Sequence, residues 1–208
     1  MGPAQLVKTA IMVRVYRWAG LGFFAIAILY AGLLLRGNPL PVAAVRIATA
    51  MRDGDGPVLY DFAIQDERSC SELTPDKIRK AWEILIGPLL AQSRPMGADG
   101  GKLAGNQTQA TASYSYLDRE GNPWKLVVIA NQTDDGAKDQ IIYTMLATAS
   151  LFDDAGHAQA TLTSDLSLKG LHRFRAPLEA AGIHRLMLGL GTCVSWDQLE
   201  AKLRPPTS

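Results

Sequence analysis

The longest apolar stretch of the chain lies near its N-terminus. Residues Trp18 to Leu35 form a run of eighteen residues without a charged side chain. As a helix this run would be about 27 Å long, close to the roughly 30 Å hydrocarbon core of a bilayer. We therefore predict a membrane-spanning helix at 18–35, preceded by a short tail at 1–17.

A cleaved signal peptide is the alternative to a membrane anchor. The apolar core of a signal peptide usually has about 7 to 15 residues and ends close to a cleavage site made of small residues. Here the apolar run is longer, and the nearest small-x-small triplet, Ala48-Thr49-Ala50, lies well downstream. This spacing favours an uncleaved, single-pass anchor.

Basic residues flank the predicted span unevenly. Lys8, Arg14 and Arg17 precede it, whereas the fifteen residues that follow contain only Arg36 and Arg46. Because basic residues collect on the cytoplasmic side of membrane spans, we expect a cytoplasmic N-terminus. The main domain would then lie in the periplasm, anchored to the inner membrane of a bacterium.

Small residues share one face of the predicted span. Gly22, Ala25 and Gly32 follow one another at intervals of three and seven residues. Small side chains let membrane helices approach closely, so this seam would contact other membrane proteins. Ordinary lipid-facing composition is the alternative explanation.

Residues 36–56 are predicted to be a linker between the span and a domain at 57–208. Pro39 and Pro41 oppose continuation of the membrane helix. Small and apolar residues then recur at helical spacing, so a short helix on the membrane surface is the alternative within this segment. The string Asp53-Gly54-Asp55-Gly56 lacks the further oxygen ligands of a calcium loop and predicts a turn.

The domain begins with one predicted strand and one predicted helix. Residues 58–64 are rich in β-branched and aromatic side chains, which favours a strand. Thr74 suits a helix cap and Pro75 the first helical position, and apolar residues follow with a period of 3.6. Gly87-Pro88 should bend or end this helix.

Two hairpins with similar turns are predicted next. The first joins residues 111–117 to 124–130, and the second joins 141–151 to 157–166, each through a D-x-x-G turn. The arm 141–151 also suits a helix, but its Thr, Tyr and Ile content favours a strand. Together these elements predict an α+β fold, with an antiparallel β-meander and one main packed helix.

The remaining elements are short. Residues 94–105 are glycine-rich and without a period, which indicates an exposed loop. A short helix is expected at 177–181 and a buried strand at 185–190. Ser195 and Gln198 then have the spacing of a capping box that opens a final helix.

The chain contains two cysteines, Cys70 and Cys193, which lie 123 residues apart. An even number of cysteines in an exported domain predicts a disulfide. The glycines of the sequence Gly189 to Cys193 would let a strand turn tightly enough for the two cysteines to meet. Two buried free thiols are the alternative, and the absence of C-x-x-C spacing argues against redox catalysis or zinc binding.

Composition and motifs exclude several classes of function. The 21 basic and 20 acidic residues are balanced, which argues against nucleic-acid binding, and 48% of residues are apolar, which argues against disorder. His157, His172 and His184 form no metal-binding motif, and no G-x-S-x-G elbow occurs. We therefore predict no catalytic residue, no cofactor-binding residue and no metal ligand.

The leading functional hypothesis is a non-catalytic accessory, scaffolding or assembly subunit of a larger bacterial membrane complex. Its partners would be the lipid bilayer and other integral membrane proteins. The alternative is a membrane-anchored periplasmic module that binds a ligand or lipid, which a large cavity in the domain would support. An anchored periplasmic hydrolase or thiol enzyme is the third hypothesis, and it requires histidines, cysteines or carboxylates that converge in a cleft.

Overall fold

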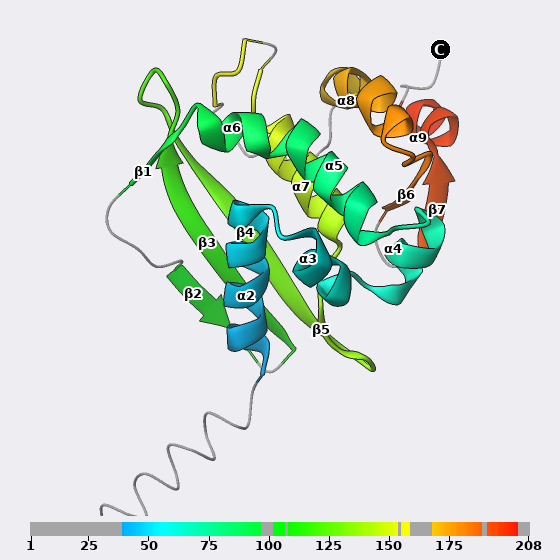
Figure 1. The fold of residues 1–208 in the computed structure, drawn as a ribbon, viewed down its shortest axis with the longest axis horizontal. Helices are drawn as coiled ribbons and strands as arrows, with labels where there is room; N and C mark the ends of the chain where they lie inside the picture. Colours follow the sequence, from blue (N-terminus) through cyan, green and yellow to red (C-terminus); the bar gives the residue numbers. More distant parts are fainter. Residues whose placement is uncertain are drawn as a thin grey trace, which may run out of the picture. The chain divides into compact units, whose positions relative to one another are not determined.

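The computed structural model describes residues 39–96, 102–106, 108–153, 155–158, 168–188 and 191–203. It is a mixed arrangement of helices and antiparallel strands, which confirms the α+β class (Figure 1). The helices are α2 (Leu40–Asp53), α3 (Gly56–Phe62), α4 (Gln65–Cys70), α5 (Pro75–Leu85), α6 (Gly87–Ala91), α7 (Ile141–Ser150), α8 (Leu168–Ala180) and α9 (Trp196–Leu203). The strands are β1 (Arg94–Pro95), β2 (Lys102–Gly105), β3 (Gln109–Leu117), β4 (Pro123–Thr133), β5 (Gly136–Lys138), β6 (Arg185–Leu188) and β7 (Thr192–Ser195).

The larger sheet is built around the hairpin β3–β4. Its order is β1-β3-β4-β5, β2 also pairs with β3, and all pairs are antiparallel. The β3–β4 register runs from Gln109 opposite Asn131 to Leu117 opposite Pro123. This confirms the first predicted hairpin. The predicted exposed loop at 94–105 is wrong in part, because β1 and β2 lie within it.

Helix α2 covers one face of this sheet. Helix α2 packs against β3 and β4 (Figure 1). Alternate strand residues point to the same face, and Ala112 and Val128, which are buried, belong to the face that α2 covers. Ile47 and Met51 of α2 are fully buried in the core. The expected linker at 36–56 is therefore wrong for residues 40–53, which form a helix, as the alternative within this segment allowed, and this helix packs in the core of the folded domain.

The strand predicted at 58–64 is wrong, because α3 occupies most of that segment. The Asp55 carboxylate accepts a hydrogen bond of 3.1 Å from the Val58 N–H, and Pro57 lies in the first turn. A cap followed by proline is a helix-start signal. In this segment it outweighs the β-branched and aromatic content.

The second predicted hairpin is also wrong. Residues 141–150 form helix α7, which was the alternative to a strand. Of the arm predicted at 157–166, residues 159–166 lie outside the described residues. The expected four-stranded meander is thus replaced by the strands listed above. The expected single packed helix is replaced by several, since α2, α5 and α7 all contribute buried residues to the core.

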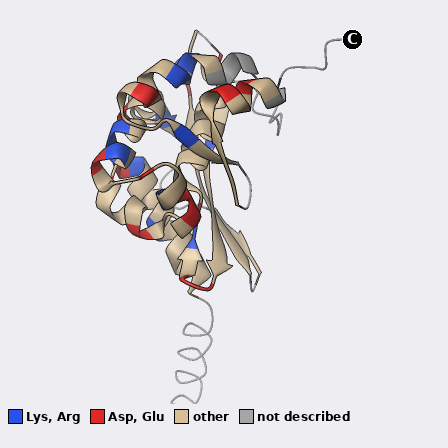
Figure 2. Cartoon of the chain, turned by 90° about the vertical axis from the view of Figure 1, so that its right-hand side faces the viewer, with Lys and Arg blue, Asp and Glu red and all other residues tan. Residues whose placement is uncertain are grey.

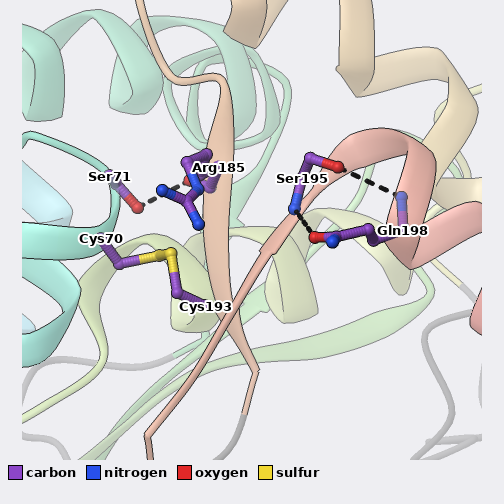
Figure 3. Close-up of a disulfide and its surroundings, with 6 residues drawn as sticks. All are labelled: Cys70, Ser71, Arg185, Cys193, Ser195 and Gln198. Atoms are coloured by element: carbon purple, nitrogen blue, oxygen red, sulfur yellow. Dashed lines mark hydrogen bonds between the residues drawn. A yellow bond between two sulfur atoms is a disulfide. The ribbon is translucent and has the colours of Figure 1, made fainter.

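Local helix signals predicted α5 and the start of α9 well, whereas residues 177–180 of the short helix expected at 177–181 are the end of the longer helix α8. The Thr74 hydroxyl accepts from the Lys77 N–H at 3.2 Å and opens α5, and a new helix, α6, begins at Gly87. At α9 the Ser195 N–H donates to Gln198 Oε1 at 2.9 Å, and the Gln198 N–H donates to the Ser195 hydroxyl at 3.3 Å (Figure 3). The capping box is confirmed.

The predicted membrane span at 18–35 lies outside the described residues. The same holds for the tail at 1–17 and for Gly22, Ala25 and Gly32. Among the helices that the structure describes, none has the length and apolar character needed to cross a bilayer.

Candidate functional site

The two cysteines form a disulfide. Cys70 ends α4 and Cys193 lies on β7, and their sulfur atoms are bonded (Figure 3). Beside it, the Ser71 hydroxyl donates a 2.7 Å hydrogen bond to the main-chain oxygen of Arg185 on β6. The predicted disulfide is confirmed, and it joins α4 to the β6–β7 hairpin. Neither sulfur is a free thiol that could act as a nucleophile.

The three histidines do not converge. His157 lies in a turn, where its ring nitrogens are 3.3 Å from Glu120 and 3.4 Å from Asp153. His172, on α8, is 3.3 Å from Glu200, and His184 is an exposed residue before β6. In the part of the chain that the structure describes, no group of three or more His, Cys, Asp or Glu residues could hold a metal ion.

A cleft of about 900 Å³ opens between β4 and α7. This volume lies within the range of about 300 to 1,000 Å³ that is usual for ligand pockets. Its surface is mostly apolar, with a smaller number of polar groups around it. Figure 2 shows that charged residues gather mainly on the helices, whereas the strands carry few of them. The described lining residues include one cation, Lys125, and one acid, Asp139.

The strand side of the cleft is the face of the sheet that α2 leaves uncovered. Because strand residues alternate between faces, Lys125, Val127 and Ile129 point away from α2. Ile129 is 39% exposed, and Met96, which also lines the cleft, is 49% exposed. Large apolar side chains with this much exposure on a concave surface mark a site where another molecule can be buried.

The helix side of the cleft is one face of α7. Tyr143, Ala147 and Leu151 recur at intervals of four residues and line the cleft together. The opposite face of α7 is buried in the core through residues that include Met145 and Leu146. Helix α7 therefore serves both the core and the cleft, and on the cleft side it also carries Thr144 and Thr148.

A buried carboxylate from α4 caps the N-terminus of α7. Glu67 is fully buried and accepts hydrogen bonds from the N–H groups of Ile141 at 2.7 Å, Ile142 at 3.0 Å and Tyr143 at 3.3 Å. The first N–H groups of a helix have no partner within the helix, and Gln140 at the cap position makes no side-chain cap bond. Glu67 supplies the missing acceptor.

A second buried carboxylate, Asp139, lies where the cleft meets the start of α7. It is 4% exposed and accepts from the Gln140 N–H at 2.8 Å, the Thr144 hydroxyl at 3.2 Å and the Ile129 N–H. Burial raises the pKa of Asp139 to about 7. Burial also raises the pKa of Glu67 to about 8, and the nearby charge of Asp139 adds to this shift, while the N–H bonds to Glu67 oppose it.

These carboxylates predict that the protein loses stability as the pH rises. The pKa of Glu67 is about 4.5 when unfolded and about 8 when folded, so the folded state binds the proton more tightly. The free energy of unfolding should therefore fall between about pH 5 and pH 8. Urea unfolding at several pH values measures this slope. The double variant Glu67→Gln/Asp139→Asn should flatten it, and an unchanged slope in that variant would contradict the assignment.

Sequence reasoning did not identify either carboxylate. Glu67 contacts residues more than seventy positions away, so no spacing in the sequence reveals its role.

Uncharged polar groups outnumber charged ones in the described lining of the cleft. Its described lining contains no histidine or cysteine, and both oxygens of Asp139 already accept hydrogen bonds. Amides and hydroxyls from Gln109, Asn131 and Thr133 instead offer uncharged hydrogen-bonding groups. No family model, curated protein or solved structure matches this chain.

Proposed function

We propose that this protein is a membrane-anchored periplasmic binding module, whose cleft between β4 and α7 holds a mainly apolar ligand. The observation that carries the proposal is the cleft itself, with its apolar walls and few polar groups. Burial of apolar surface contributes about 25 cal/mol per Å². The amides and hydroxyls would then orient the ligand.

The disulfide supports the proposed periplasmic location of the domain. Structural disulfides persist in oxidising environments such as the periplasm and are rare in the cytosol. The Cys70–Cys193 bond therefore agrees with an exported domain. It also agrees with the uncharged run at 18–35 serving as an anchor.

Filling the cleft should abolish ligand binding. Ala147 lines the cleft on α7, so the indole of Ala147→Trp would occupy the space that an apolar chain needs. We expect its affinity for a fluorescent fatty acid to fall at least about tenfold, which is a loss of about 1.4 kcal/mol. The measurement is a fluorescence titration of the full-length chain in amphipol.

Val42→Trp is the matched control for this titration. Val42 is 61% exposed on α2 and is not among the residues that line the cleft. The Val42→Trp variant adds the same indole outside the cleft and should bind the fatty acid with the affinity of the wild type. Equal affinities for all three proteins, or no binding by the wild type, would contradict the proposal.

An accessory or assembly subunit is the second candidate. The outer face of α2 presents Val42 and Val45, which are 61% and 40% exposed and one helical turn apart. A partner protein could cover them. Purification of the full-length chain in mild detergent, followed by mass spectrometry, tests this candidate. Stoichiometric co-elution with a membrane complex would support it, and elution without other proteins would contradict it.

A further inference from the structure

The two ends of the cleft differ in charge, and contacts between α7 and β4 define them. At one end, Asp139, which comes shortly before α7, accepts a hydrogen bond from the Ile129 N–H. At the other end, the ring of Phe152 packs edge-on against Trp124, with 5.1 Å between the ring centroids. Lys125 follows Trp124 in β4 and lines the cleft. We call these the aspartate end and the lysine end.

The aspartate end offers an anion little. A helix N-terminus usually attracts an anion through its N–H groups, but here those groups already have acceptors. The first three N–H groups of α7 donate to the buried Glu67 carboxylate, and the Gln140 N–H donates to Asp139. An anionic group at this end would meet the acceptor oxygens of two acids, and like charge wherever these acids are ionised.

The lysine end has the opposite character. Lys125 is exposed, and its ammonium forms no ion pair with any residue that the structure describes. The last carbonyl groups of a helix carry the negative end of its dipole. For α7, the Arg173 guanidinium covers that end, because it donates to the Ala149 oxygen at 2.7 Å and to the Phe152 oxygen at 2.6 Å. An anionic group here would meet a cation.

The acidic side chains of the neighbouring turns are already bonded. Asp118 accepts hydrogen bonds from four N–H groups. Glu120 and Asp153 lie 3.3 Å and 3.4 Å from the ring nitrogens of His157. None of these residues is among those that line the cleft. Lys125 is therefore the charge that a ligand would meet at this end.

Between its two ends the cleft is largely apolar. Val127 and Ile129 line it from the face of β4 that α2 leaves uncovered, and α7 supplies the other wall. Past Ile129 the lining becomes polar again, where the Gln109 amide donates to the Asn131 side-chain oxygen at 3.1 Å. From Lys125 to Asn131 the strand covers about 20 Å. This order of a cation, an apolar stretch and an uncharged polar end matches a molecule with one charged head and an apolar chain.

We propose that the cleft binds an anionic amphiphile, with its acidic group at Lys125 and its acyl chain along Val127 and Ile129 toward Asn131. The acidic group is a carboxylate or a phosphate, which share the negative charge that Lys125 complements. This inference rests on the proposed binding function, and it adds the chemistry of the ligand and the direction in which it lies.

A matched pair of probes tests the charge of the head group. A fluorescent fatty acid and the fatty alcohol with the same chain and dye are titrated into the full-length chain in a nonionic amphipol. The acid should bind about fivefold more tightly, as expected for one exposed ion pair. Lys125→Met keeps the apolar stem, so it should remove this preference and leave the affinity for the alcohol within about twofold.

Lys80→Met is the matched control for this titration. Lys80 is exposed on α5 and is not among the residues that line the cleft. The variant loses the same charge elsewhere on the domain and should keep the preference for the acid. Equal affinities of the wild type for acid and alcohol would overturn the inference, as would an undiminished preference in Lys125→Met.

Competition distinguishes the two possible acidic groups. Unlabelled fatty acid and unlabelled lysophosphatidate are each used to displace the fluorescent acid. A preference for either one supports the inference, provided that Lys125→Met weakens that competitor about fivefold. Displacement by the uncharged fatty alcohol that is as effective as displacement by both acids would overturn it.

Spin-labelled fatty acids test the direction of the chain in the wild type. A nitroxide near the carboxyl group should broaden the methyl NMR signals of Met96 and Leu151, which line the lysine end. A nitroxide at the end of the chain should broaden those of Ile64 and Ile129, at the aspartate end. The reverse pattern would overturn the proposed orientation.

These outcomes separate the inference from the proposed function. If acid and alcohol bind equally and Ala147→Trp blocks both, the cleft remains the binding site and the anionic head group is wrong. If neither probe binds, both proposals fall. If Lys125→Met does not fold, the comparison of acid with alcohol and the spin labels decide, because both use the wild type.

Discussion

Replacing Cys70 and Cys193 together by serine should lower the free energy of unfolding by about 4 to 5 kcal/mol. The two residues are 123 positions apart, and cross-linking positions this distant removes much conformational entropy from the unfolded chain. In a chain of this size, 1 kcal/mol shifts the Tm by about 2–4 °C. The double variant should therefore melt about 8–20 °C below the wild type.

Thermal denaturation followed by circular dichroism, with and without a reductant, measures this effect. Ser71→Ala is the matched control, because it removes the neighbouring hydrogen bond to Arg185 and keeps the disulfide. The Ser71→Ala variant should lower the free energy of unfolding by only about 1 kcal/mol. A wild-type Tm that does not respond to the reductant would refute the prediction.

Glu67→Ala should destabilise the fold by about 3 kcal/mol or more. The change leaves three main-chain N–H groups at the start of α7 without their acceptor. Each buried donor left unsatisfied costs about 1–3 kcal/mol, and release of the buried carboxylate offsets part of that sum. Because α7 forms one wall of the cleft, binding of the fatty acid should weaken as well.

Urea unfolding followed by tryptophan fluorescence measures the loss, and hydrogen exchange at residues 141–143 locates it. Glu72→Ala is the control, since the Glu72 side chain is 86% exposed and makes only a 3.9 Å ion pair with Lys77. It should change stability by less than about 0.5 kcal/mol. If Glu67→Ala proved as mild as this control, Glu67 would not be the cap of α7.

Sequence predicted the elements whose signals are local. Helix α5 has its cap and first-turn proline in adjacent positions, and α9 has both residues of its capping box within four positions. The β3–β4 hairpin is held by a turn in which the Asp118 carboxylate accepts from the N–H groups of Glu120 and Asn122. In each case the partners are neighbours in the chain.

The errors occurred where distant contacts decide the structure. Helix α7 lacks a local cap and is rich in β-formers, but Glu67 caps it from α4. Helix α2 begins after Pro39 and contains Pro41, and these two prolines suggest a linker, but one face of the distant β3–β4 sheet gives the helix a surface to cover. For α3 the local signal was present at Asp55 and Pro57, and side-chain composition was given too much weight.

The candidate site was less predictable than the fold. The disulfide followed from a count of two cysteines. The cleft forms because α7 is a helix that lies beside β4. Because residues 141–151 were expected to form a strand, the cleft could not be predicted.

Methyl NMR spectra of the full-length chain in amphipol, labelled at alanine and valine and titrated with the fatty acid, test the cleft most directly. The binding proposal predicts shifts at Val127 and Ala147, which line the cleft, and unchanged signals from Val42 and Val45 on the outer face of α2. Shifts at Val42 and Val45, with Val127 and Ala147 unmoved, would contradict the proposal that this cleft is where the protein binds its ligand.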